Sequence, residues 1–227
     1  MTDQLQILDS LLDDARAFRP DLITDLVGAT EVPSEFSFAV PTLVELEQEG
    51  LPYFFHEIEW LGSINWEEAG TEIAADIVAT LAVAWATSSY LDFELVAEEV
   101  SAGIASGSEL EGELARLSAV VSEEEPKFGG LDMGIAGLVY ALSAAGYLTV
   151  ASCRGHGPGI GWSEVPVVYF AATSAQFEVL APQVDMFGGT VTVDDEHPDL
   201  LCLALPSCLH AQQLALVLVR QFLPDVS

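Results

Sequence analysis

Residues 149–162, TVASCRGHGPGIGW, hold the densest group of side chains in this chain that could do chemistry. Arginine is a planar cation suited to carboxylate or phosphate, and histidine can donate a hydrogen bond, accept one or bind a metal near neutral pH. The glycines permit positive φ and let the backbone approach a ligand closely, and the tryptophan offers a flat apolar surface. We therefore expect a site for a small anionic or planar ligand at Cys153, Arg154, Gly155, His156 and Trp162.

The same stretch also has a structural interpretation. The glycines would make a long hairpin loop, and Cys153 would fill a space in the core. Arg154 would pair with one of the many carboxylates of the chain, and His156 would hydrogen-bond the backbone. The sequence leaves both interpretations open.

Metal binding is a further possibility for this stretch. Cys153 and His156 have ligand-like spacing, and further candidate ligands follow downstream at His197, Cys202, Cys208 and His210. Two such pairs could close a zinc tetrahedron. However, Cys202 falls within an apolar strand and no compact second pair is present. We therefore expect core cysteines and surface histidines, with no metal ion and no other cofactor.

Thiol catalysis is the remaining candidate chemistry. Cys208 directly follows Ser207, the predicted N-cap of the last helix, where the helix dipole lowers the pKa of a thiol. His156 or His210 could serve as its base. No orienting acid can be assigned from spacing, so the sequence names no catalytic residue and leaves open whether the protein is an enzyme.

A family resemblance enters at the same residues. The segment TVASCRGH, after a helix that ends in AAGY, is similar to the Thr-x-x-Ser-Cys-x-Gly segment of the methyltransferases that act third in wybutosine synthesis on tRNA. The later LLCLALPSCLHAQQLALVL is similar to a strand-then-helix segment of that family, so the resemblance covers residues 131–223. It implies a shared fold, and for the family S-adenosylmethionine and tRNA as substrates. We do not carry over the activity, because the chain lacks a basic surface and has His156 where the family favours Arg.

Charge is the strongest compositional signal. The chain has 36 acidic and 6 basic residues, a formal net charge of −30. Residues 1–130 carry 27 acidic and 4 basic side chains, whereas residues 131–227 carry 9 and 2. Such a field repels phosphate backbones and attracts cations, so we expect no direct nucleic-acid binding. General solubility, a docking face for a basic protein and adaptation to high salt all remain open as reasons for the acidity.

Cellular location is inferred from three further features. The N-terminus lacks the basic and apolar regions of a signal peptide. The most apolar window, residues 73–91, is interrupted by Asp76, so we expect a buried helix and no membrane association. Three cysteines are too few and too sparse for a disulfide framework. We expect a cytoplasmic protein.

Periodicity predicts an α+β fold in two domains. Residues 1–127 form an acidic, mainly helical domain, with helices over residues 3–18, 41–49, 65–86, 93–104 and from 108, and with residues 53–60 as a strand or helix. Asn65 is the expected N-cap of the third of these helices, and Ser108 and Glu111 have the spacing of a capping box. Residues 128–227 form an α+β domain of order αββαββα, a two-layer sandwich of a four-stranded, mainly antiparallel sheet with helices. Its strands are predicted at residues 147–153, 165–172, 189–195 and 199–206. Its helices are predicted at residues 131–146, at 173–188 with a break at Pro182 left open, and from Ser207 onwards.

Two functions are compatible with these features. The first is a non-enzymatic acidic binding or regulatory protein that engages a basic protein partner, as an immunity protein or an antitoxin does. The alternative is a small-molecule-binding protein or enzyme that uses the glycine-rich loop from Cys153 to Trp162.

Overall fold

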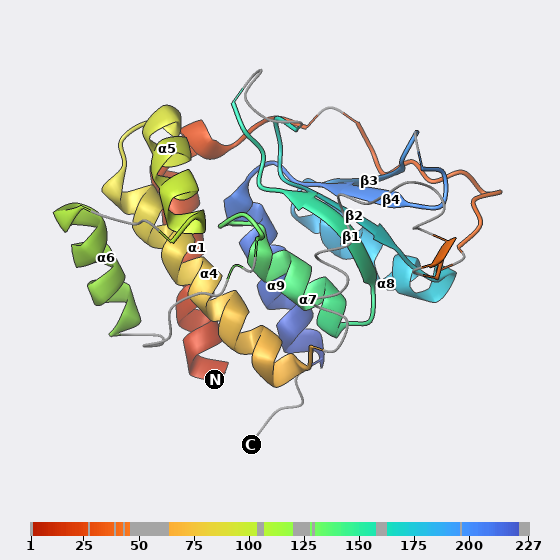
Figure 1. Cartoon of the computed structure of the whole chain (residues 1–227), viewed down its shortest axis with the longest axis horizontal. Helices are drawn as coiled ribbons and strands as arrows, with labels where there is room; N and C mark the ends of the chain where they lie inside the picture. The colour runs from red at the N-terminus through yellow and green to blue at the C-terminus, as the bar shows by residue number, and fades with distance from the viewer. Residues whose placement is uncertain are drawn as a thin grey trace.

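The computed structural model describes most of the chain, namely residues 2–26, 28–38, 40–42, 44–45, 64–103, 107–119, 128, 130–157, 163–195 and 197–222. Figure 1 shows helices on one side of the molecule and a twisted sheet on the other, with α7 and α9 between them. The predicted α+β class, with a helical N-terminal part, is confirmed. The predicted element at residues 53–60 and most of the one at 41–49 lie outside the described residues.

The helical part contains four α-helices and one 3-10 helix within the described residues: α1 (Thr2–Phe18), η1 (Pro20–Leu22), α4 (Trp66–Ala86), α5 (Tyr90–Ser101) and α6 (Ser108–Ser118). Apolar residues recur on one side of α1 at helical spacing, and that side is buried. Its buried residues are Leu5, Leu8, Leu12 and Ala15.

The N-termini of these helices show what the sequence predicted well and where it was wrong. Asn65 caps α4 as expected, and its side chain accepts hydrogen bonds from the backbone N–H groups of Glu67 and Glu68. By contrast, the capping box predicted from Ser108 is absent. Gly107 is the N-cap of α6 and makes no side-chain cap bond, so Ser108 is already the first helical residue.

The second part consists of α7 (Ala136–Ala144), β1 (Leu148–Cys153), β2 (Val167–Ala171), α8 (Ser174–Met186), β3 (Thr190–Val193), β4 (Leu201–Ala204) and α9 (Cys208–Phe222). This is the predicted order αββαββα. The described strands form one sheet in the order β1-β2-β4-β3, and every neighbouring pair is antiparallel. Pro182, where a helix break was considered, lies inside a continuous α8.

Helix α7 begins later than the sequence predicted. Residues 131–132 have no regular secondary structure and residues 133–135 form a turn, in which Gly134 has a φ of +91°. Asp132 lies beside the end of β1, where the backbone N–H of Arg154 donates to its carboxylate. The late start of α7 therefore matters for the site described below.

One hydrophobic cluster contains residues from both halves of the chain. A buried polar contact crosses the same boundary, because the carboxylate of Asp76 on α4 accepts hydrogen bonds from the backbone N–H groups of Gly134 and Gly137, each at 2.7 Å. The side-chain amide of Gln212 on α9 donates to it at 2.6 Å. The predicted boundary at 127/128 falls where residues 120–127 and 129 lie outside the described ones, so the division into two domains stays a prediction.

Helix α4 is the helix against which α1, α5, α6, α7 and α9 pack. It is long and apolar enough to cross a membrane by length and composition, but 67% of its most apolar window is buried inside the protein. Figure 1 shows it between α1, α6 and α7. The expected buried helix is confirmed, with Ala86 as its end. Residues 87–89 connect it to α5, and only Tyr90 and Leu91 of the apolar window lie in α5.

Candidate functional site

The end of β1 and the loop that follows it carry four of the five predicted site residues. Cys153 ends the strand, and Arg154, Gly155 and His156 follow it directly. The backbone N–H of His156 donates to the carbonyl of Ser163 at 2.9 Å, which holds the two sides of the hairpin together. Trp162 lies outside the described residues, so its predicted role stays untested.

Gly155 is required at its position by both conformation and space. Its φ is +83°, in the region that side chains other than glycine rarely adopt. A Cβ on Gly155 would lie 2.6 Å from the carbonyl carbon of Val165 and 2.8 Å from the nitrogen of Pro166. The glycine therefore lets the residues that lead into β2 pass close to the loop. No open space for a ligand adjoins Gly155 on the side of Val165 and Pro166.

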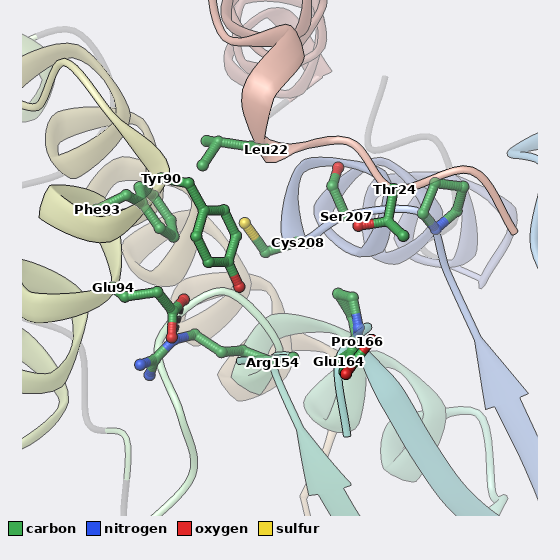
Figure 2. A pocket seen from close by; sticks show the side chains of 12 residues that line it. Leu22, Thr24, Tyr90, Phe93, Glu94, Arg154, Glu164, Pro166, Ser207 and Cys208 are labelled. Atoms are coloured by element: carbon green, nitrogen blue, oxygen red, sulfur yellow. Dashed lines mark hydrogen bonds and ion pairs between the residues drawn. The ribbon is translucent and has the colours of Figure 1, made fainter. Parts of the chain in front are cut away.

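The guanidinium of Arg154 is the centre of the site. Its side chain is fully buried and points to α5, where Glu94 and Glu98 lie one helical turn apart on the same face. Nη2 of Arg154 donates to Glu98 at 2.7 Å, and Nε lies 3.4 Å from Glu94. Figure 2 shows Glu94 reaching from α5 to this guanidinium.

Asp132 is the third carboxylate of the cluster. Its Oδ1 lies 3.9 Å from Nη1 of Arg154, which has no hydrogen-bond partner among the described residues. The pKa of Arg154 is raised: burial acts to lower it, but Glu94, Asp132 and Glu98 together outweigh burial. The three carboxylates and one guanidinium leave an excess of negative charge at the loop.

His156 is held by the same carboxylates. Its Nδ1 lies 3.0 Å from Oε2 of Glu94, and its Nε2 lies 3.8 Å from Oδ2 of Asp132. Its side chain is 12% exposed. The structural interpretation expected a hydrogen bond from His156 to the backbone, and the backbone N–H of this residue does make one, but its ring contacts carboxylates.

The pocket beside this cluster is small. It is lined by Tyr90, Glu94, Arg154, Gly155, Ser207 and Cys208, among others, and its enclosed space has room for about one water molecule. The side chains in Figure 2 converge on this space from α5, the loop and the start of α9. Within the described residues, the loop therefore contacts carboxylates of the same chain. The small pocket leaves little room beside Arg154 for a bound anion.

The three thiols are poor nucleophiles in this fold. Burial raises the pKa of Cys208 to about 12, which corrects the expectation that the dipole of α9 would lower it. Burial also raises the pKa of Cys153 to about 11 and that of Cys202 to about 11. A thiol that stays protonated at neutral pH is neither a ready nucleophile nor easily oxidised.

The downstream histidines do not join the loop. His197 lies 2.8 Å from Asp194 in the turn that leads from β3 to β4. His210 on α9 shares a hydrogen bond of 2.8 Å with Ser207, and burial lowers its pKa to about 4. The zinc site that would combine Cys153 and His156 with the downstream cysteines and histidines is therefore not formed.

Sequence reasoning missed Glu94, Glu98 and Asp132, which complete the site. Each is one acid among 36, and they come from segments 22 to 60 residues away from Arg154 along the chain. The only local signal was the spacing of Glu94 and Glu98, which places two carboxylates on one face of a predicted helix.

Comparison with known proteins adds no assignment. We found no match to this chain among protein-family models, curated proteins or solved structures. The fold shared with the third-step wybutosine methyltransferases therefore stays a prediction from the segment around Ser152 and Cys153.

Proposed function

We propose that the protein is a non-enzymatic acidic binding protein that engages a basic protein partner, in the manner of an immunity protein or an antitoxin. The observation that carries the proposal is the use of its arginines. All five arginines pair with carboxylates of the same chain, while the sixth basic residue, Lys127, lies outside the described residues. The pairs are Arg16–Asp13, Arg19–Asp21, Arg116–Glu113, Arg154–Glu98 and Arg220–Asp9, with N–O distances of 2.7 to 2.9 Å.

Burial removes two of these cations from the surface altogether. Arg154 has a fully buried side chain, and that of Arg19 is 3% exposed and donates to the carbonyls of Ala84 and Thr87 at the end of α4. Most acids among the described residues, by contrast, are exposed. The surface field therefore favours cationic partners over polynucleotides.

Helix α5 offers the best place for such a partner. Leu91 and Leu95 are one turn apart and 58% and 60% exposed, on the side of α5 away from its buried residues. Phe18 at the end of α1 is 61% exposed, and the next residue, Arg19, lies over the ring of Phe93 on α5. Figure 1 shows this end of the N-terminal segment beside α5. We call Leu91 and Leu95 the α5 patch.

Acidic residues accompany the α5 patch. Asp92 and Glu99 on the same helix are exposed. An apolar centre beside carboxylates is complementary to a helix or loop that carries apolar residues between lysines or arginines. The apolar part would supply affinity, and the carboxylates would accelerate and orient the encounter.

Affinity purification from the source cells tests this proposal. The wild-type protein should retain one or more basic proteins at low salt and release them as salt increases, because screening shortens the range of surface charges to about 8 Å at physiological ionic strength. The double variant Leu91→Ser/Leu95→Ser and the variant Glu99→Lys should lose the partner. The matched control is Glu178→Lys, an exposed glutamate on α8, which should keep it.

Three outcomes would count against the proposal. One is a partner that is neutral or acidic and insensitive to salt. Another is retention that disappears after nuclease treatment, which would indicate nucleic acid. The third is equal loss in Glu99→Lys and Glu178→Lys, which would indicate general acidity and no docking face.

The alternative function at the glycine-rich loop stays a prediction. It requires Arg154 and His156 to hold a ligand, so replacing both with alanine should abolish ligand-induced stabilisation. In the described residues both side chains are engaged by Glu94.

A further inference from the structure

Asp132, Cys153 and His156 bring three different metal-ligating atoms together. Among the described residues their carboxylate oxygen, Sγ and ring nitrogen lie within 4.8 Å of one another. They come from two segments, the residues before α7 and the end of β1 with the loop after it, and the hydrogen bond from the backbone N–H of Arg154 to Asp132 joins these segments. We propose that they form a binding site for one divalent transition-metal ion of the zinc type.

The donor set selects the class of ion. A thiolate and an imidazole suit Zn²⁺ and related ions, whereas Mg²⁺ and Ca²⁺ prefer oxygen ligands alone. The Cys153 thiol is protonated in the metal-free protein, so the ion displaces its proton to solvent as the bond to sulfur forms. Zinc bonds of about 2.0–2.3 Å in a tetrahedron place the ligand atoms roughly 3.3–3.7 Å apart. Binding therefore requires the three side chains to close in by about 1 Å, which rotation about their side-chain bonds can supply.

His156 is already oriented for ligation. Its Nδ1 is 3.0 Å from the buried carboxylate of Glu94, so an N–H at that position donates to Glu94 and leaves the lone pair on Nε2. Nε2 is the nitrogen that faces Asp132, at 3.8 Å. A carboxylate that holds the far nitrogen of a metal-ligating histidine is the usual outer partner in such sites.

Arg154 adds a second, independent observation. Its Nη1 is buried, lies 3.9 Å from Asp132 and has no hydrogen-bond partner among the described residues. Three protein ligands leave a fourth tetrahedral position for water or another small ligand. The unpaired N–H groups of Nη1 are available to an oxygen atom at that position. The ion enters on the side of Asp132, whose side chain is 29% exposed.

The site is compatible with the charge of its surroundings. Glu94, Glu98 and Asp132 outnumber Arg154, so a bound cation lowers the excess of negative charge there. The proposal does not depend on a basic protein partner, because Asp132, Cys153 and His156 lie outside the α5 patch.

Cobalt substitution of the full chain tests the proposal. The purified wild-type protein, stripped of metal with a chelator, is titrated with Co²⁺ alone. We expect one tightly bound ion per chain, with the intense visible bands of tetrahedral cobalt and a near-ultraviolet thiolate-to-cobalt band. Zn²⁺ should remove these bands by competition. In Cys153→Ser the thiolate band should be absent, and in Glu94→Gln the affinity for Co²⁺ should fall about 10–100-fold.

The control is Cys202→Ser, which removes a thiol on β4 that is not part of the cluster and should leave the spectrum unchanged. Circular dichroism of each variant checks that it is folded. If Cys153→Ser does not fold, the conservative variant Asp132→Asn serves instead and should weaken Co²⁺ binding at least tenfold. A thiolate band that persists in Cys153→Ser, or weak octahedral cobalt bands alone in the wild type, would overturn the proposal.

Discussion

Replacing Arg154 with methionine removes the cation at the centre of the buried cluster. Breaking a buried ion pair from one side costs about 3–5 kcal/mol, because the remaining charge stays buried without compensation. Of its three carboxylates, only Glu94 is buried, with a side chain 7% exposed, whereas Glu98 is 59% and Asp132 29% exposed. Glu94 also keeps its contact with His156. We therefore expect the lower end of the range, about 3 kcal/mol.

Urea denaturation followed by circular dichroism measures this effect. In a chain of this length about 3 kcal/mol corresponds to a fall in Tm of roughly 6–12 °C. The double variant Arg154→Met/Glu94→Gln should recover part of the loss, with a coupling free energy of about 1–3 kcal/mol. The matched control Arg16→Met breaks a more exposed pair with Asp13 and should cost less than about 1 kcal/mol. A loss below about 1 kcal/mol for Arg154→Met, or no coupling to Glu94, would refute the reasoning.

The remaining predictions concern the loop glycine, the buried titratable groups and the thiols. Gly155→Ala should destabilise the protein by at least about 2 kcal/mol in the same denaturation assay, because of its positive φ and the close backbone of Val165, whereas Gly112→Ala, at an open helical position, should stabilise it by about 0.5–1 kcal/mol. Burial raises the pKa of Asp76 to about 6, so the folded protein takes up this proton at a higher pH than the unfolded chain. The contribution of Asp76 to stability therefore rises by about 3 kcal/mol as pH falls from about 7 to about 4. Asp76→Asn lacks this contribution and should lose more stability over this range than the wild type. Burial lowers the pKa of His210 to about 4. As pH falls below about 6.5 the unfolded chain protonates this histidine and the folded protein does not, so the free energy of unfolding decreases. His210→Gln should therefore lose less stability than the wild type over this range. Urea curves at several pH values measure both differences, and parallel pH profiles in all three proteins would contradict them. Finally, Cys153 and Cys208 should react with a thiol reagent only after unfolding, and fast labelling of either in the native state would contradict their burial.

Local patterns predicted the fold well because its elements follow local rules. Helical spacing identified α1, the capping residue Asn65 identified the start of α4, and apolar runs bounded by turns identified the four strands in order. The failures also had local causes. Gly107 preceded Ser108 as the cap of α6, and the turn at residues 133–135, where Gly134 has a positive φ, delayed the start of α7.

The site was only half predictable. Cys153, Arg154, Gly155 and His156 adjoin one another in the sequence, so their proximity needed no fold. Their partners Glu94 and Asp132 are brought in by the packing of α5 and the turn before α7 against the end of β1. Tertiary contacts of this kind leave no local pattern in an acidic chain, because almost any arginine has many carboxylates to choose from.

The central claim is that the arginines are paired with carboxylates of the same chain, so that the α5 patch and the acids beside it are free to bind a cationic partner. Its most direct test is the affinity of a synthetic amphipathic helix of leucine and lysine, measured by fluorescence anisotropy against wild type and Leu91→Ser/Leu95→Ser at increasing salt, with single-stranded RNA as the second probe. We expect binding of the helix that weakens steeply with salt, at least tenfold weaker binding to the variant, which corresponds to about 1.4 kcal/mol, and no binding of RNA. Equal affinity for both proteins, or tighter binding of RNA than of the helix, would contradict the claim.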